Sequence, residues 1–124
     1  MHARRGLLVG APAAPVPPNV VVAYDRPRGG ETLGAYVTRQ LGELMGAAQD
    51  FQLAGRRDLT FAGRAAVELT FSWAAAPGRM QQRQIFTLLA DGRVASVATT
   101  AAADDFATAE ETFTAILCSL RWAA

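Results

Sequence analysis

Residues 65–73 read AAVELTFSW, and this stretch decides the fold. Apolar and polar side chains alternate along it, which is the pattern of a β-strand with one buried face. The expected buried face holds Val67, Leu69, Phe71 and Trp73, and the opposite face holds Glu68, Thr70 and Ser72. Branched and aromatic side chains suit a pleated, half-buried surface. The stretch therefore predicts a β-sheet as the frame of the molecule.

Turn signals on both sides of this strand extend the sheet. Ala62-Gly63 predicts a tight turn back to a strand over residues 53–61, and Pro77-Gly78 predicts a turn into a strand over residues 80–89. Asp91-Gly92 is a strong hairpin signal before a strand over residues 94–100. The branched run over residues 19–24 predicts a first strand, separated from the others by a helical segment.

Two segments repeat their apolar side chains with the helical period. The first runs from about Glu31 to Ala48, with Glu31 and Thr32 at its N-terminus and Arg39 and Glu43 on its outer side. Its expected buried residues are Leu33, Tyr36, Val37, Gln40, Leu41 and Leu44. The second is expected to be capped by Asp104 and to bury Phe106, Ala109, Phe113, Ile116, Leu117 and Leu120.

The order strand, helix, four strands, helix predicts an α+β fold. We expect an antiparallel β-sheet meander with two amphipathic helices packed on one face, which leaves the other face for function. Residues 1–18 hold four of the six prolines and are expected to form an irregular N-terminal segment, and residues 19–124 a single domain. Arg121-Trp122 is a candidate for a short terminal strand.

Composition excludes several function classes. A net charge of +1 gives no electrostatic case for binding nucleic acid or anionic lipid. One cysteine and one histidine exclude an internal disulfide, a thiol metal cage and a histidine-based catalytic triad. Cys118 is expected to be an inert packed thiol in the last helical turn. We therefore expect no catalytic residues, no metal and no cofactor.

The beginning of the chain was also considered as an export signal. Arg4-Arg5 is followed by an apolar run, but Gly10 and Pro12 interrupt that run before it reaches the length of a signal peptide core. No stretch is long enough to cross a bilayer. These features favour a protein of the cytoplasm that does not insert directly into a membrane.

Glutamines form the most unusual pattern in the chain. Gln40 lies at the centre of the apolar stripe of the first helix, and residues 80–84 read MQQRQ within a predicted strand. Alternation places Gln82 and Gln84 on one face with Phe86, and Arg83 on the other. The ordinary interpretation is a solvated sheet surface, because surface side chains are usually polar. The alternative is a polar site in which these amides join Gln40, since a buried amide needs partners.

A charge pair is also predicted between neighbouring strands. Glu68 can reach Arg83 across the hairpin that Pro77-Gly78 closes. Such a pair is commonly structural, and a single carboxylate provides no acid and base pair for catalysis.

Several short stretches together resemble a known family. They are Arg26, Gly30-Glu31-Thr32-Leu33, Tyr36-Val37, Arg39-Gln40-Leu41, Val67-Glu68-Leu69-Thr70-Phe71-Ser72-Trp73 and Gln82-Arg83-Gln84. In order and spacing, from about Val20 to Trp122, they resemble DcrB-like domains and most of all the effector-associated (Eag) chaperones of bacterial type VI secretion. That resemblance implies a PsbP-like sandwich that forms a homodimer and is not an enzyme.

The resemblance also implies a partner and a site. Eag chaperones hold the hydrophobic, transmembrane-type helices at the N-terminus of a secreted effector before it is loaded on the secretion spike. The residues that match the expected client groove are Gln40, Gln82 and Gln84, with Met80 and Phe86 as apolar neighbours. A DcrB-like structural or binding protein of the cell envelope is the alternative. Relatives usually begin with additional early strands, and Met1 to Pro18 carries no matching pattern. We therefore expect those N-terminal strands to be missing, because of a late start or a shortened variant.

Overall fold

The computed structural model of the chain describes residues 17–76 and 78–120. The seven elements are β1 (Asn19–Asp25), α1 (Leu33–Ala47), β2 (Gln52–Phe61), β3 (Arg64–Ala75), β4 (Gly78–Leu88), β5 (Val94–Ala102) and α2 (Ala103–Ser119). Every strand and helix predicted within the described ranges is present in the predicted order. The strand suggested at Arg121-Trp122 lies outside the described residues.

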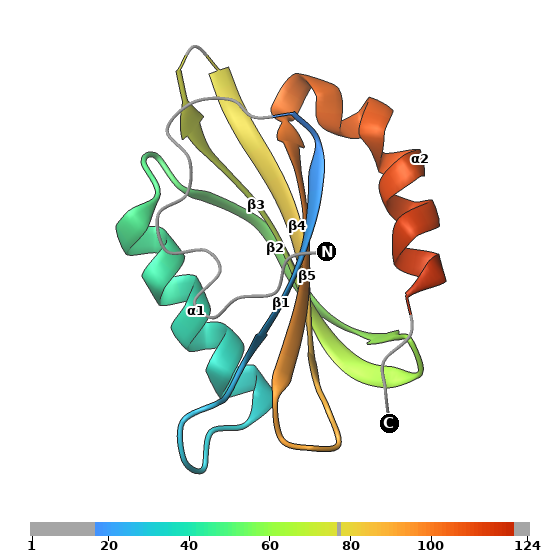
Figure 1. The fold of residues 1–124 in the computed structure, drawn as a ribbon. Coiled ribbons are helices and arrows are strands. Elements are labelled where there is room, and N and C mark those ends of the chain that lie inside the picture. The colour runs from blue at the N-terminus through green and yellow to red at the C-terminus, as the bar shows by residue number, and fades with distance from the viewer. Residues whose placement is uncertain (1–16, 77, 121–124) are drawn as a thin grey trace.

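One five-stranded sheet forms the centre of the molecule (Figure 1). Its order is β1-β5-β4-β3-β2, and all neighbours run antiparallel. Ala62 and Gly63, with φ of 51° and 79°, form the turn between β2 and β3, as expected for a two-residue hairpin. The predicted meander is therefore confirmed for β2 to β5, and β1 pairs with β5 at the opposite edge from β2.

The helices lie on opposite faces of the sheet (Figure 1). Helix α1 packs against Val67 and Phe86 on one face, which we call the α1 face. Helix α2 packs through Leu117 against Ile85 and Val97 on the other, the α2 face. The prediction that both helices share one face was therefore wrong.

The reason is visible in β4 and β5. Phe86 and Ile85 are adjacent in β4, point to opposite faces and are both buried. Eight of the nine residues of β5 are buried as well. A strand that is apolar on both faces needs a cover on each side, and one helix supplies each cover.

The polar side chains at the N-termini of α1 and α2 stabilise the two helices in different ways. At α1 the Thr32 hydroxyl accepts a hydrogen bond from the backbone N–H of Ala35 at 3.1 Å, which confirms the predicted cap. At α2 the N-cap residue is Ala102, which has no capping side chain, and Asp104 lies in the first turn. Asp104 therefore acts on the helix dipole and not as the cap that the sequence suggested.

The predictions for other core residues are mostly confirmed. Phe71, Trp73 and Phe86 are each at most 2% exposed and belong to the α1-side core. Cys118 is exposed on α2, so its prediction as a packed thiol was wrong. It lies one residue beyond Leu117, the side chain that turns toward the sheet, and one helical step rotates it out of the core.

Candidate functional site

Gln82 and Gln84 lie on the α1 face of β4. Gln82 is paired with Phe71 and Gln84 with Leu69 in the neighbouring strand, and their exposed fractions are only 3% and 1%. Their sequence neighbours on that face, Met80 and Phe86, are equally buried. The ordinary interpretation of this stretch as a solvated sheet surface was therefore wrong.

The two strand amides are joined by hydrogen bonds inside the core. Gln82 Nε2 donates to Gln84 Oε1 at 3.2 Å, and the hydroxyl of Thr100 donates to Gln82 Oε1 at 3.0 Å. The register explains this contact, because Thr100 of β5 pairs directly with Gln82. Within residues 17–76 and 78–120, no hydrogen bond engages Gln84 Nε2. The described residues therefore hold a carboxamide row in which one donor group has no partner among them.

The third predicted amide is that of Gln40, a buried residue of helix α1. It is 4% exposed and lies on the turn between Val37 and Leu44, both of which belong to the α1-side core. Its side-chain amide has no hydrogen-bond partner among the described residues. Burying such an amide without a partner costs about 1–3 kcal/mol. Gln40 therefore weakens the packing around it unless something else binds its amide.

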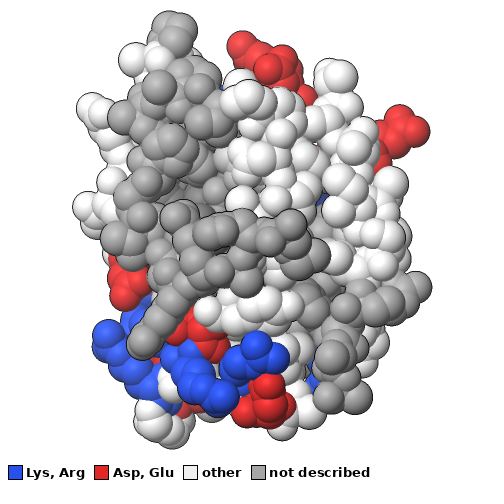
Figure 2. Space-filling view, in the orientation of Figure 1, with Lys and Arg blue, Asp and Glu red and all other residues white. Residues whose placement is uncertain are grey.

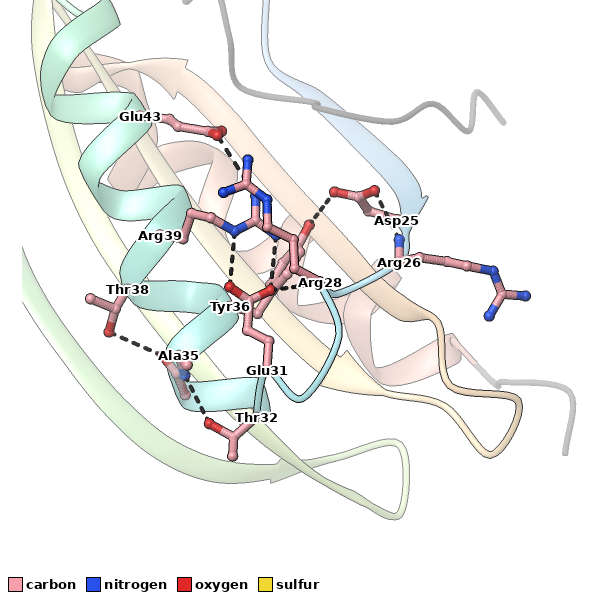
Figure 3. A network of polar contacts seen from close by, with 11 residues as sticks. Asp25, Arg26, Arg28, Glu31, Thr32, Ala35, Tyr36, Thr38, Arg39 and Glu43 are labelled. Carbon is pink, nitrogen blue, oxygen red and sulfur yellow. Dashed lines mark hydrogen bonds and ion pairs between the residues drawn. The ribbon is translucent and has the colours of Figure 1, made fainter.

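A polar network fixes α1 over the sheet (Figure 3). The Tyr36 hydroxyl donates to Asp25 Oδ2 at the end of β1 at 2.8 Å. Arg39 forms two hydrogen bonds with Glu31 and an ion pair with Glu43, and its guanidinium lies 5.0 Å from the centre of the Tyr36 ring. These contacts set the rotation of α1, and with it the direction in which Gln40 points.

The network also shifts two pKa values. The hydrogen bond from Arg39 lowers the pKa of Glu31 from 4.5 to about 2, against a smaller opposing effect of burial. Burial raises the pKa of Tyr36 well above its ordinary range, and the hydrogen bond to Asp25 raises it further. Glu31 is thus charged and Tyr36 neutral over the whole physiological range, so the anchoring of α1 does not change with pH there.

Met80, Gln82, Gln84 and Phe86 share the α1 face of β4, and Gln40 is one of the buried residues of α1. None of the five exceeds 4% exposure, and no hydrogen bond among the described residues joins Gln40 to the two strand amides. Their side chains contact the protein's own atoms and not solvent. A partner reaches them only when part of the cover over the α1 face moves.

On the α2 face, Glu68 forms the predicted ion pair with Arg83 and also a second one with Arg57. The sequence analysis missed Arg57, although the two-residue turn at Ala62-Gly63 places it directly opposite Glu68. Only 6% of the Glu68 side chain is exposed, so both guanidiniums serve a buried carboxylate. This trio lies on the opposite side of the sheet from the carboxamides.

Charged side chains of both signs gather on one part of the surface (Figure 2). In this view they lie at the lower end, where Figure 1 shows the β1–α1 connection and the β4–β5 hairpin. Mixed signs within one small area favour local ion pairs, such as that between Arg93 and Asp91, over binding of a polyanion.

The part of the chain that the structure describes contains neither a membrane-spanning helix nor a metal site. Neither helix is long and apolar enough to span a membrane. No group of three or more His, Cys, Asp or Glu residues in this part of the chain could hold a metal ion.

Solved structures share this fold. A protein of unknown function from Pseudomonas aeruginosa, PA94, described as a putative regulator, matches with a TM-score of 0.77 and 24% identity over 91% of this chain and 80% of its own. LpqN of Mycobacterium tuberculosis, described as involved in cell envelope biogenesis, matches with a TM-score of 0.67 and 22% identity, covering 86% of this chain and 64% of LpqN.

The PsbP-like architecture expected from the sequence is confirmed. Cyanobacterial PsbP (CyanoP) from Synechocystis sp. PCC 6803 matches with a TM-score of 0.59 and 13% identity, over 80% of this chain and 64% of its own. No curated protein matches the sequence. A family model described as DcrB matches residues 8–119, so the chain belongs to the DcrB family.

Proposed function

We propose that this protein is a non-enzymatic chaperone or adaptor of bacterial type VI secretion. In this proposal a cytoplasmic homodimer holds the hydrophobic, transmembrane-type helices at the N-terminus of an effector until the effector is loaded on the spike. The observation that carries the proposal is the buried amide of Gln40, which has no hydrogen-bond partner among the described residues, on the helix that packs over the face of the Gln82–Gln84 row.

The chemistry of these buried residues suits a helix that is apolar along its whole length. Apolar neighbours such as Met80 and Phe86 offer such a helix a water-free surface, and a few amides can fix its position along that surface. A carboxamide both donates and accepts hydrogen bonds without the desolvation cost of a charge. Small residues on a client helix would allow close approach of the two backbones.

Binding at these residues requires an opening of the protein. The five residues are covered in the isolated chain, so the client has to displace part of that cover. These amides favour the exchange, because a client that binds Gln40 and Gln84 Nε2 offsets the cost of burying groups that have no partner within residues 17–76 and 78–120. The polar network around Arg39 holds α1 to the end of β1, so this end of the helix acts as the hinge of the opening.

The test is co-purification with a client. The protein is co-expressed with the apolar N-terminal segment of the effector encoded beside it, and the complex is isolated through a tag on the effector. Replacing Gln40 and Gln84 by Met keeps the side-chain volume and removes both amides. We expect the double variant to retain about a tenth or less of the bound client, which corresponds to the loss of one to two buried hydrogen bonds.

The matched control is Gln81→Met, three residues before Gln84 and on the opposite face of β4. It should capture the client as the unchanged protein does. Equal capture by all three proteins would refute the site, and failure of the unchanged protein to bind would refute the function. Light scattering of the purified complex tests the homodimer.

A second function is favoured by the likeness to LpqN, whose description places it in cell envelope biogenesis. In that case the protein is an envelope-associated structural or binding protein. Fractionation of the source bacterium separates the two proposals, because a type VI chaperone remains in the cytoplasmic fraction and an envelope protein does not.

A further inference from the structure

A groove on the α2 face is independent of the carboxamide row. It lies between the C-terminal half of α2, through Thr114 and Leu117, and the edge strand β2, through Leu59 and Phe61, with Ile85 of β4 at its base. Its volume is about 430 Å³, within the range of about 300–1,000 Å³ usual for small-molecule sites. Leu59, Phe61, Ile85 and Leu117 give the groove its apolar walls, and Thr60 and Thr114 contribute polar groups.

Two arginines are the charged members of the groove lining. Arg57 of β2 and Arg83 of β4 both donate through Nε to Glu68 of β3, which lies between them in the sheet. Each carboxylate oxygen of Glu68 thus receives one guanidinium, and both guanidiniums are held in fixed positions. In the described part of the chain, the terminal Nη atoms of Arg57 and Arg83 have no hydrogen-bond partner.

The net charge of Arg57, Arg83 and Glu68 indicates the charge of the ligand that fits the groove. Two guanidiniums and one carboxylate leave a net charge of +1 at one side of an apolar groove. A planar carboxylate matches the fork of free Nη donors, and its single negative charge balances the site. The apolar remainder of the groove requires a hydrocarbon tail on the same molecule, since each buried methylene contributes about 0.8 kcal/mol.

We infer that this groove binds a single-chain fatty acid, with its carboxylate on Arg57 and Arg83 and its acyl chain between α2 and β2. The inference concerns the face of the sheet opposite the proposed client site, so either one can fail without the other.

The thiol of Cys118 can be used to detect a ligand in the groove. Cys118 is the single cysteine of the chain, is exposed and belongs to the groove lining. A ligand in the groove should therefore slow alkylation of Cys118 by a maleimide. We measure that rate on the full chain against dodecanoate below its micellar concentration, and confirm the affinity by calorimetry.

The expected result is saturable protection by dodecanoate. Dodecanol, which has the same chain without the charge, and acetate, which has the charge without the chain, should bind at least about tenfold more weakly. Arg57→Gln should weaken dodecanoate binding about fivefold, in line with loss of one partly exposed charge-assisted contact. Thr114→Trp should block the groove from the exposed side of α2.

The control is Arg56→Gln, the same change in charge at the neighbouring residue, whose guanidinium donates to Gly34 and Thr38 of α1 on the opposite face of the sheet. It should bind dodecanoate as the unchanged protein does. Dodecanol binding as tightly as dodecanoate would overturn the inference, as would equal effects of the two arginine variants or binding by Thr114→Trp. Binding only after removal of residues 121–124, which follow the groove residue Leu120, would assign the groove to the chain's own end and would also overturn it.

Discussion

Arg39 hydrogen-bonds both carboxylate oxygens of Glu31, which precedes it by eight residues, through Nε and Nη2 at 2.9 Å each. Glu31 lies before the first residue of α1 and Arg39 lies on that helix. The pair therefore joins the entry loop to α1, and both side chains are largely covered, with 19% of Arg39 and 12% of Glu31 exposed. Paired, bidentate geometry of this kind is stronger than an ordinary surface ion pair.

Glu31→Gln should make stability less dependent on acid pH. The pKa of Glu31 is lowered from 4.5 to about 2, so its charged form stabilises the fold above the unfolded pKa, and this contribution is lost as the pH falls from 4.5 toward 2. We expect the variant to unfold at lower urea concentration than the unchanged protein at neutral pH, and the difference to shrink across that window. Glu110→Gln, an exposed change on α2, is the control. A difference that stays constant from neutral pH to pH 2 would contradict the assigned role of Arg39.

Gln40→Met and Gln84→Met should change stability in opposite directions. Gln40 has no described hydrogen-bond partner, so replacing its amide by an apolar side chain of similar size should raise the free energy of unfolding by about 1 kcal/mol. Gln84 accepts a hydrogen bond from Gln82, and its loss should lower that free energy by about 1–2 kcal/mol. Chemical denaturation of both variants provides the measurement. Destabilisation by both would show that Gln40 is satisfied within the chain, and would remove the main support for the proposed client site.

Arg83→Gln should destabilise the protein more than Arg57→Gln. Both side chains serve Glu68, but 23% of the Arg83 side chain is exposed against 67% for Arg57. Removing the less exposed partner leaves the buried carboxylate with a guanidinium that water already screens. We expect losses of about 1–2 kcal/mol for Arg83 and below about 1 kcal/mol for Arg57. Thermal unfolding at matched pH checks the order, and the reverse order would mean that Arg57 is the principal partner.

Ala62→Asn should stabilise the β2–β3 hairpin. Ala62 has a φ of 51°, in the left-handed region that an alanine side chain disfavours and asparagine tolerates, and it precedes Gly63 with a φ of 79°. The change creates an Asn-Gly turn, and we expect a gain of about 0.5–1 kcal/mol. Ala90→Asn in the β4–β5 hairpin is the control, because Ala90 is not among the described residues with positive φ. Equal gains in both variants would point to a general surface effect.

The sequence predicts local structure well in this protein. Alternation from Val67 to Trp73, and the turns at Ala62-Gly63 and Asp91-Gly92, locate the strands to within about two residues of those observed, as such patterns usually do. Gln40 could be assigned to a buried helical face because its apolar neighbours recur with a period of 3.6. These features depend only on residues that are close in the chain.

The errors concern features that depend on distant contacts. Gln82 and Gln84 look like surface residues, and their burial follows only from the tertiary structure, in which β4 lies inside the sheet and α1 packs on this face. The face covered by α2 could not be derived from its own stripe, because β5 is buried on both sides and β4 has a buried apolar residue on each side, Phe86 on one and Ile85 on the other. The ion pair of Arg57 with Glu68 was not predicted, because it depends on the register between β2 and β3, which places the two residues opposite each other.

Strand β4 carries Gln82, Arg83 and Gln84 in succession, with the amides on one face and the guanidinium on the other. Deleting one residue before Gln82 would shift the pairing by one position and exchange the two sets. A cation would then be driven into the aromatic core under α1, and the carboxylate of Glu68 would face neutral amides. Substitutions that keep the number of residues in this strand are therefore safer to engineer than insertions or deletions.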